Sequence, residues 1–221
     1  MFVREKSIYK LFPKYALFIR DLQSLIANPI FIFGIILRIS IIFFHKSILQ
    51  KNLFIPFIIN NINSISIDPW KSFISNGGKD FAFPYSISMV GILSPPVYIG
   101  NLLDKFFDIS YFSSIAFNLT TLFFDFILLI CILLSMQKIK TNLVLITYWL
   151  SPYVIYITYW HGQIDIVPVS IMFISLFLIT KNKYILSAIF LTISIFCKFS
   201  MVLALPFSLI YIFKKRGINT E

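Results

Sequence analysis

Charged residues and cysteines are both scarce in this sequence. Only 13% of the 221 residues are charged, whereas soluble domains carry about a quarter. The two cysteines, Cys131 and Cys197, both lie inside apolar runs, which excludes a secreted domain held together by disulfides. Acidic residues are also few, 9 against 19 basic ones. With 58% hydrophobic residues, the composition excludes a soluble globular enzyme and a disordered protein.

The apolar residues form long runs that match the length of membrane-spanning helices. A helical span needs about 20 mostly apolar residues, and shorter runs serve where protein surrounds them. The last run has room for one tilted helix or for two short helices that meet near Lys198, and we favour the hairpin because it keeps both flanking basic clusters on one side. We therefore expect spans at about 29–47, 109–136, 143–160 and 166–180 and a hairpin at 184–213.

The remaining segments are expected to lie outside the membrane. Residues 1–28 mix basic and aromatic side chains, which suits a cytoplasmic segment at the membrane interface. Residues 48–108 are rich in asparagine, glycine and proline, and they predict a long outer loop with short interfacial helices at about 53–60 and 86–106. Residues 214–221 are expected to form a short cytoplasmic tail.

The net charge of +10 is distributed in short basic clusters between the apolar runs, at 138–140, 181–183 and 214–216. Cytoplasmic loops of membrane proteins carry an excess of Lys and Arg. This pattern therefore places the amino terminus and the three clusters in the cytoplasm, and it excludes a nucleic-acid-binding groove. The sequence predicts an all-α, multi-pass protein of the cell membrane.

Three charged residues are expected at membrane depth: Arg38, Asp125 and Lys198. Each costs at least about 2.5–3.5 kcal/mol to insert, so such groups usually face a polar cavity and a partner. Two interpretations remain open. The charges form an interhelical ion pair, such as Arg38 with Asp125, that fixes the packing, or they hold an anionic ligand at the outer end of the bundle.

Three polar features are expected on the outer side. Asp68 precedes Pro69 and Trp70, and the loop continues as Lys79-Asp80-Phe81-Ala82-Phe83-Pro84-Tyr85. The third feature follows the helix-breaking Pro152 and reads His161-Gly162-Gln163-Ile164-Asp165. These segments are either solvated loops and an ordinary polar turn among interfacial aromatic residues, or the wall of a site that binds a lipid headgroup.

Several short motifs follow one another in a fixed order: Asp68, the aromatic-proline stretch 80–85, Ser151-Pro152, the polar stretch 161–165, Ile195-Phe196-Cys197-Lys198 and Leu205-Pro206. This order resembles the GT-C glycosyltransferases, which are multispanning enzymes that take sugars from polyprenyl phosphates such as dolichyl-phosphate glucose or mannose. The stretch 80–85 has one proline where the family often has two. Family members are also longer, so the resemblance covers their amino-terminal core and implies a missing carboxyl-terminal half or a second subunit.

The resemblance implies a GT-C-like helical bundle with a long first extracytoplasmic loop and an active site on that side. The reaction would be an inverting transfer from a polyprenyl-phosphate donor to a glycan, lipid or protein acceptor, without metal or cofactor. Asp68 would be the base. The residues that would bind the substrate are Lys198, His161, Gln163, Asp165, Arg38 and Asp80.

Two other classes of function remain open on the sequence alone. A small membrane carrier or lipid flippase would use the charges at membrane depth as a relay, although transporters often show paired repeats and the sequence contains none. A non-catalytic scaffold is the third class. The glycosyltransferase interpretation requires Asp68, His161 and Lys198 to converge at one pocket at the outer membrane boundary.

Overall fold

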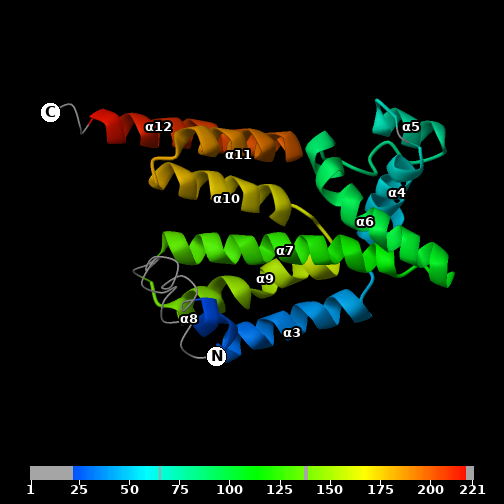
Figure 1. Ribbon diagram of the computed structural model, residues 1–221, viewed down its shortest axis with the longest axis horizontal. Coiled ribbons are helices and arrows are strands. Elements are labelled where there is room, and N and C mark those ends of the chain that lie inside the picture. The colour runs from blue at the N-terminus through cyan, green and yellow to red at the C-terminus, as the bar shows by residue number, and fades with distance from the viewer. Residues whose placement is uncertain (1–21, 65, 137–138, 218–221) are drawn as a thin grey trace, which may run out of the picture.

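The computed structural model describes residues 22–64, 66–136 and 139–217, and these residues form helices and turns with no strand among them (Figure 1). The protein is therefore all-α over this part of the chain. Most of the expected cytoplasmic segment 1–28, all of residues 218–221 and Lys138 lie outside the described residues. Within the first segment, residues 22–26 are helical.

Fourteen further helical segments follow in chain order among the described residues. They are α3 (Pro29–Phe44), η1 (Gln50–Phe54), α4 (Ile55–Asn63), α5 (Pro69–Ser75), α6 (Ile87–Phe107), α7 (Phe112–Ser135), α8 (Thr141–Val144), η2 (Leu145–Trp149), α9 (Pro152–Ile155), η3 (Tyr156–His161), α10 (Ile166–Thr180), α11 (Tyr184–Cys197), η4 (Phe199–Leu203) and α12 (Ala204–Gly217). The π-helical η1 and the 3-10 helix η4 lead directly into α4 and α12, whereas the π-helical η2 and η3 continue from α8 and α9.

Three of these helices begin with the same local chemistry, a polar capping residue followed by proline. Asn28, Asp68 and Ser151 precede a proline, and each side chain accepts a hydrogen bond from a backbone amide in the first turn. Proline suits the first helical position because its missing amide would have no partner there. These pairs set where α3, α5 and α9 start, since a cap of this kind stabilises a helix by about 1 kcal/mol.

Helix α7 lies in the middle of a bundle that α3, α10, α11 and the broken α8–η3 segment complete, while α4, α5 and α6 gather at one end (Figure 1). We call this end the outer end. The close contact between α6 and α7 depends on Gly100, where a Cβ atom would meet the backbone of Phe112 and Ser113 at 2.6–2.8 Å.

Two apolar cores hold the bundle. One lies at the outer end, where Phe57 stacks on Phe83 with ring centroids 4.6 Å apart and Phe117 is fully buried. The other follows α3, α7 and η2, where Phe31 stacks on Trp149 at 5.2 Å. Each buried side chain of this size contributes about 1.5–3 kcal/mol, so these cores fix the positions of the loops that leave the outer end.

The expected spans correspond to helices of unequal length. Within the described residues, α7 is the one helix that is long and apolar enough to cross a membrane by itself. The expected span 143–160 is broken by a 43° bend between Thr141–Trp149 and Pro152–His161, and it makes a second candidate if the pair is one span. The apolar helices α3, α10 and α11 have 16, 15 and 14 residues. Of the interfacial segments expected in the outer loop, 53–60 is longer here, as η1–α4, whereas 86–106 corresponds closely to α6.

The last apolar block consists of two helices that are separated at Lys198. Helix α11 ends at Cys197, Lys198 has an extended backbone, and η4 leads into α12. The Lys215 ammonium donates a hydrogen bond to the carbonyl of Thr180 at 3.5 Å. Since Thr180 is the last residue of α10, α12 runs back toward the end of the bundle opposite the outer end (Figure 1).

Candidate functional site

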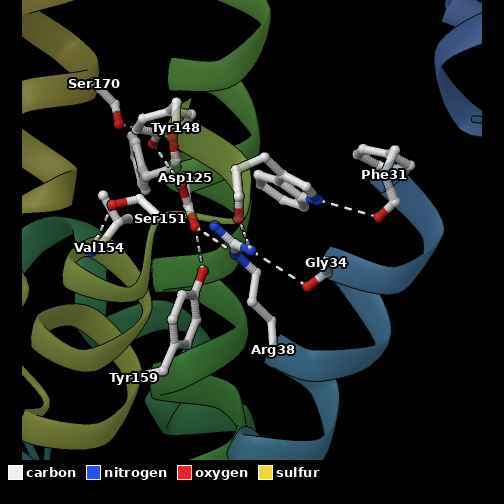
Figure 2. A network of polar contacts seen from close by, with 11 residues as sticks. Phe31, Gly34, Arg38, Asp125, Tyr148, Ser151, Val154, Tyr159 and Ser170 are labelled. Carbon is white, nitrogen blue, oxygen red and sulfur yellow. Dashed lines mark hydrogen bonds and ion pairs between the residues drawn. The ribbon is translucent and has the colours of Figure 1, made fainter. Parts of the chain in front are cut away.

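A fully buried ion pair joins α3 and α7. The Arg38 Nε donates to an Asp125 carboxylate oxygen at 2.8 Å, and both side chains are 0% exposed. The hydroxyls of Tyr148 and Tyr159 also donate to Asp125 (Figure 2). Asp125 thus accepts three side-chain hydrogen bonds from three different parts of the chain, and we call this group the inner cluster.

The π-helical turns explain how both tyrosines reach one carboxylate. Tyr148 and Trp149 lie in η2 and Tyr159 lies in η3, on either side of the Pro152 break. The Arg38 guanidinium carbon lies 3.6 Å from the centroid of the Trp149 ring, and its Nη1 donates to the Trp149 carbonyl at 2.7 Å. Short π-helical turns often occur at functional sites. Here they place side chains of η2 and η3 around the ion pair.

The inner cluster matches one of the two interpretations of the charges at membrane depth, the interhelical pair of Arg38 and Asp125. Its oxygens and most of its donors are occupied by protein groups. Among the described residues, Arg38 Nη2 is the one buried side-chain polar atom without a hydrogen-bond partner. A buried pair contributes little net stability but costs several kcal/mol to break, so the cluster ties α3, α7 and the broken segment together.

A pocket of about 480 Å³ opens at the outer end, between the residues that follow α3 and the end of η3. Its polar lining is basic or neutral: His45, Lys79, His161 and Asn52. The remaining lining side chains are aromatic or aliphatic, and none is acidic: Phe81, Tyr156, Trp160, Ile48, Leu49 and Leu53. Such a lining suits a ligand with an anionic group attached to an apolar body.

The shape of the pocket depends on contacts between residues more than 100 positions apart. The His45 ring stacks on Trp160 with centroids 4.0 Å apart, and its Nε2 lies 2.9 Å from the Trp160 carbonyl. The Ser47 hydroxyl donates to the His161 carbonyl, and Gln50 Nε2 donates to the Gly162 carbonyl at 3.2 Å. These contacts hold the end of η3 against the start of the outer loop.

Gly162 is required at this contact for two reasons. Its φ of +90° lies in the left-handed region that other residues rarely adopt, and an added Cβ atom would overlap the Ser47 side chain. Glycine allows both the turn and the close approach. The break in the polar stretch 161–165 therefore places His161 on the pocket wall.

A third polar group lies near the pocket, at the start of α10 and the end of α11. The Tyr85 hydroxyl donates to one Asp165 carboxylate oxygen at 2.7 Å, and Lys198 Nζ donates to the other at 2.7 Å. The side chains of Lys198 and Asp165 are 32% and 34% exposed. Burial and then the charge of Asp165 raise the pKa of Tyr85 well above its usual value, so this phenol remains protonated and donates. We call this group the outer cluster.

The residues predicted to form one site are distributed among these places. His161 lines the pocket, and Asp80 lies between the lining residues Lys79 and Phe81. Asp68 is exposed and accepts a hydrogen bond from the Lys71 amide at 3.1 Å as the cap of α5. Gln163 is half-buried next to Gly162, Asp165 and Lys198 form the outer cluster, and Arg38 belongs to the inner cluster.

The convergence expected for Asp68, His161 and Lys198 is thus not present as a direct contact. Among the described residues, no hydrogen bond or ion pair joins the three, and only His161 of the three lines the pocket. Asp68 and Lys198 already have protein partners, because a helix start and a carboxylate lie within their reach. No group of three or more His, Cys, Asp or Glu side chains in the described part of the chain could hold a metal ion.

Sequence reasoning missed four residues that define the pocket and the outer cluster. His45 and Trp160 are separated by 115 positions, and their stacking has no local signal in the sequence. Tyr85 ends an aromatic stretch that gives no sign of the specific contact between its hydroxyl and Asp165. Lys79 could have been found, since it stands beside Asp80 in a loop that was expected to cover a headgroup.

No protein-family model matches the chain, and no curated protein or solved structure matches it significantly. These results neither support nor exclude the resemblance to the GT-C glycosyltransferases. The function of the site therefore has to be inferred from its own residues.

Proposed function

We propose that the chain is a polytopic membrane protein. The helices α3, α11 and α12 carry large apolar side chains that the rest of the described chain leaves exposed, and in water such wide apolar faces would favour aggregation. Lipid tails solvate them instead. Examples of these exposed side chains are Phe33 and Ile36 in α3, Ile185, Ile189 and Phe196 in α11, and Phe207, Ile210 and Phe213 in α12.

The distribution of charge along the bundle supports the same proposal. Lys140 precedes α8, Lys181 and Lys183 lie between α10 and α11, and Lys214 and Lys215 lie in the last turns of α12, all at the end opposite the pocket (Figure 1). The described aspartates lie at the outer end, apart from Asp125 in the inner cluster. Lysines also occur at the outer end, in or beside the long segment 48–108: Lys46, Lys51, Lys71, Lys79 and Lys105. Because basic residues in short loops mark the cytoplasmic side whereas long loops cross regardless of charge, this distribution supports an extracytoplasmic pocket.

We further propose that the pocket binds a polyprenyl-phosphate sugar and that the protein transfers this sugar to an acceptor. The observation that carries the proposal is the pocket lining, which combines two histidines and a lysine with aromatic and aliphatic side chains and has no acidic member. His161 and Lys79 would hold the phosphate, Trp160 and Phe81 would pack on the sugar and the prenyl chain, and Asp80 would contact sugar hydroxyls at the rim.

The proposed reaction is an inverting displacement. The oxygen of an acceptor hydroxyl forms a bond to the anomeric carbon, the bond from that carbon to the phosphate oxygen breaks, and polyprenyl phosphate leaves. Asp68 does not line the pocket, but it is an exposed carboxylate in the same outer segment as the lining residues Lys79 and Phe81, and it would take the proton of the hydroxyl. A well-placed base contributes typically 10²–10⁴-fold, and fixed cations beside the developing phosphate charge stabilise the transition state further.

The test uses the protein in lipid vesicles with a radiolabelled polyprenyl-phosphate glucose or mannose and a membrane extract as acceptor. Asp68→Asn removes the proposed base but keeps the helix cap, because asparagine caps helices as well as aspartate does. We expect this variant to lose sugar transfer at least 100-fold with donor binding unchanged. Asp108→Asn is the matched control, since Asp108 is an exposed loop aspartate with a left-handed backbone that asparagine tolerates. Equal activity of Asp68→Asn and the wild type would remove Asp68 from the base role.

A lipid-phosphate carrier is the second candidate, and the absence of a carboxylate from the pocket lining favours it. A carrier needs to hold the phosphate but needs no base beside it. Under this alternative, vesicles that contain the protein would move a labelled polyprenyl phosphate between leaflets without forming a glycosyl product. His161→Ala would then reduce this movement, and Asp68→Asn would not.

A further inference from the structure

Besides residues 45–53, two loops contribute to the pocket, and each has its far end in the outer cluster. Residues 79–85 place Lys79 and Phe81 in the lining and end at Tyr85, while residues 161–165 place His161 in the lining and end at Asp165. The hydrogen bond from the Tyr85 hydroxyl to Asp165, at 2.7 Å, joins these two far ends directly.

Lys198 joins the same carboxylate to a third segment. Its Nζ donates to the second Asp165 oxygen at 2.7 Å and lies 5.5 Å from the centroid of the Tyr85 ring. One residue away on each side, the Ser86 amide donates to the Cys197 carbonyl at 3.1 Å. The two pocket loops and the end of α11 therefore meet at one aspartate.

Each loop is anchored separately by other contacts. Phe83 is buried, stacks on Phe57 and accepts a hydrogen bond from the Trp70 indole at 3.1 Å, whereas Gly162 is held by Gln50 at 3.2 Å. The anchors Phe57 and Gln50 both belong to the continuous segment η1–α4, which holds each loop from one side. The outer cluster adds a hydrogen bond that joins the two loops to each other directly.

We infer that Tyr85, Asp165 and Lys198 form a clasp that sets the position of the two pocket loops relative to each other. In this role the three side chains are positioning residues. They fix the position of Lys79 and Phe81 relative to His161 and do not contact the ligand. Both carboxylate oxygens of Asp165 accept a hydrogen bond within the cluster, and one of them accepts it from the ammonium of Lys198. The ligand in this inference is that of the proposed function, but the geometry of the clasp does not depend on it.

The first experiment measures the geometry without any ligand. Nitroxide labels on Lys79→Cys and His161→Cys report the distance between the loops by pulsed electron paramagnetic resonance in lipid nanodiscs, and the natural cysteines are buried. We expect a narrow distance distribution that becomes at least twice as broad with Tyr85→Phe or Asp165→Asn. Tyr98→Phe, at an exposed tyrosine of α6, is the matched control. An unchanged width in both clasp variants would overturn the inference.

Tyr85→Phe is suited to this test because it removes one hydroxyl and keeps the ring. The ring packs edge-on against Phe54 at 5.7 Å and lies 5.3 Å from Phe83, so the variant is expected to fold. Loss of one hydrogen bond of this kind corresponds to a change of about 3- to 10-fold in an equilibrium constant. The affinity for undecaprenyl phosphate, used as the probe, should fall by that factor.

A double-mutant cycle distinguishes the clasp from direct contact between Lys198 and the phosphate. If the three residues act as one unit, Tyr85→Phe and Lys198→Met weaken binding similarly, and the double variant is no weaker than the stronger single effect. Additive losses, with Lys198→Met by far the larger, would overturn the positioning role. If the wild type does not bind undecaprenyl phosphate, the proposed function fails while the distance measurement still decides on the clasp.

Discussion

The inner and outer clusters have the same chemical composition, a basic side chain and at least one tyrosine around an aspartate, but they differ in burial. Arg38 and Asp125 are 0% exposed, whereas Lys198 and Asp165 are about one-third exposed. Breaking an ion pair that water cannot reach leaves an uncompensated buried charge and costs several kcal/mol, so the inner cluster holds the helices together. An ion pair that water reaches contributes little to the stability of the fold, so the outer cluster acts by positioning the loops that it joins.

The largest difference between the clusters is expected when one aspartate is neutralised. Asp125→Asn leaves Arg38 buried without a counter-ion and should lower the free energy of unfolding by about 3–5 kcal/mol. Asp165→Asn, the matched change in the outer cluster, should lower it by about 1 kcal/mol or less. Thermal unfolding of both variants in one detergent measures the difference. Equal losses would mean that burial does not separate the two clusters.

Substitution of Gly162, which lies between the pocket residue His161 and the outer-cluster residue Asp165, should lower the free energy of unfolding nearly as much. Gly162→Ala forces a side chain into the left-handed region and against Ser47, which should cost about 1–3 kcal/mol. It should also weaken the binding of undecaprenyl phosphate, because His161 is the neighbouring residue.

Gly91→Ala is the control for this prediction. Gly91 lies within α6 and has no atom within 4 Å of an added Cβ, so alanine should be neutral or stabilising by about 0.5–1 kcal/mol. A similar change in stability for both glycine variants would contradict the structural role of Gly162.

A third aspartate, Asp104, makes the stability of the folded protein depend on pH in the acid range. Burial alone would raise its pKa, but hydrogen bonds from Ser113 and from the amides of Tyr111 and Phe112 outweigh burial, and the pKa of Asp104 is lowered. Its stabilisation is therefore fully present above about pH 4, the usual value for aspartate, and is lost as the pH falls through the lower pKa of the folded state.

Unfolding temperatures between pH 6 and pH 2 test this expectation. The wild type should lose stability over the acid end of this range more steeply than Asp104→Asn, because the variant has no carboxylate to protonate. Parallel pH profiles for the two proteins would show that the Asp104 hydrogen bonds do not favour the charged form.

The smallest effect is expected at Asp68, whose carboxylate is exposed and caps a short helix. Asp68→Ala should destabilise α5 locally by about 1 kcal/mol and Asp68→Asn by much less. Hydrogen exchange of the amides in residues 69–75 measures this. Faster exchange in both variants would show that the charge of Asp68, in addition to its role as a cap, stabilises α5.

Local features of the sequence predicted much of the helical arrangement. The apolar run 109–136 corresponds to α7, since a long apolar run without breakers leaves a helix as its one stable state. Pro152 indicated the break in the segment 143–160, and the structure bends there by 43°. The lengths of α3, α10 and α11 could not be derived in this way, because their ends depend on caps and on the loops they meet.

The candidate site was predicted less completely. Arg38 could be paired with Asp125 because few charges lie at that depth and each needs a partner. His161 was expected at the outer end and lines the pocket there. The attachment of Lys198 to Asp165 joins residues 33 positions apart, and its geometry depends on how α10 and α11 pack.

Composition and run length by themselves determined that this chain is helical and apolar, with basic clusters between its apolar runs, because these properties follow from the local chemistry of each segment. The tertiary structure decided which polar side chains meet. The stacking of His45 on Trp160 and the meeting of Tyr85, Asp165 and Lys198 arise because helix packing brings distant segments within 3–4 Å of each other, and no local pattern encodes such distances.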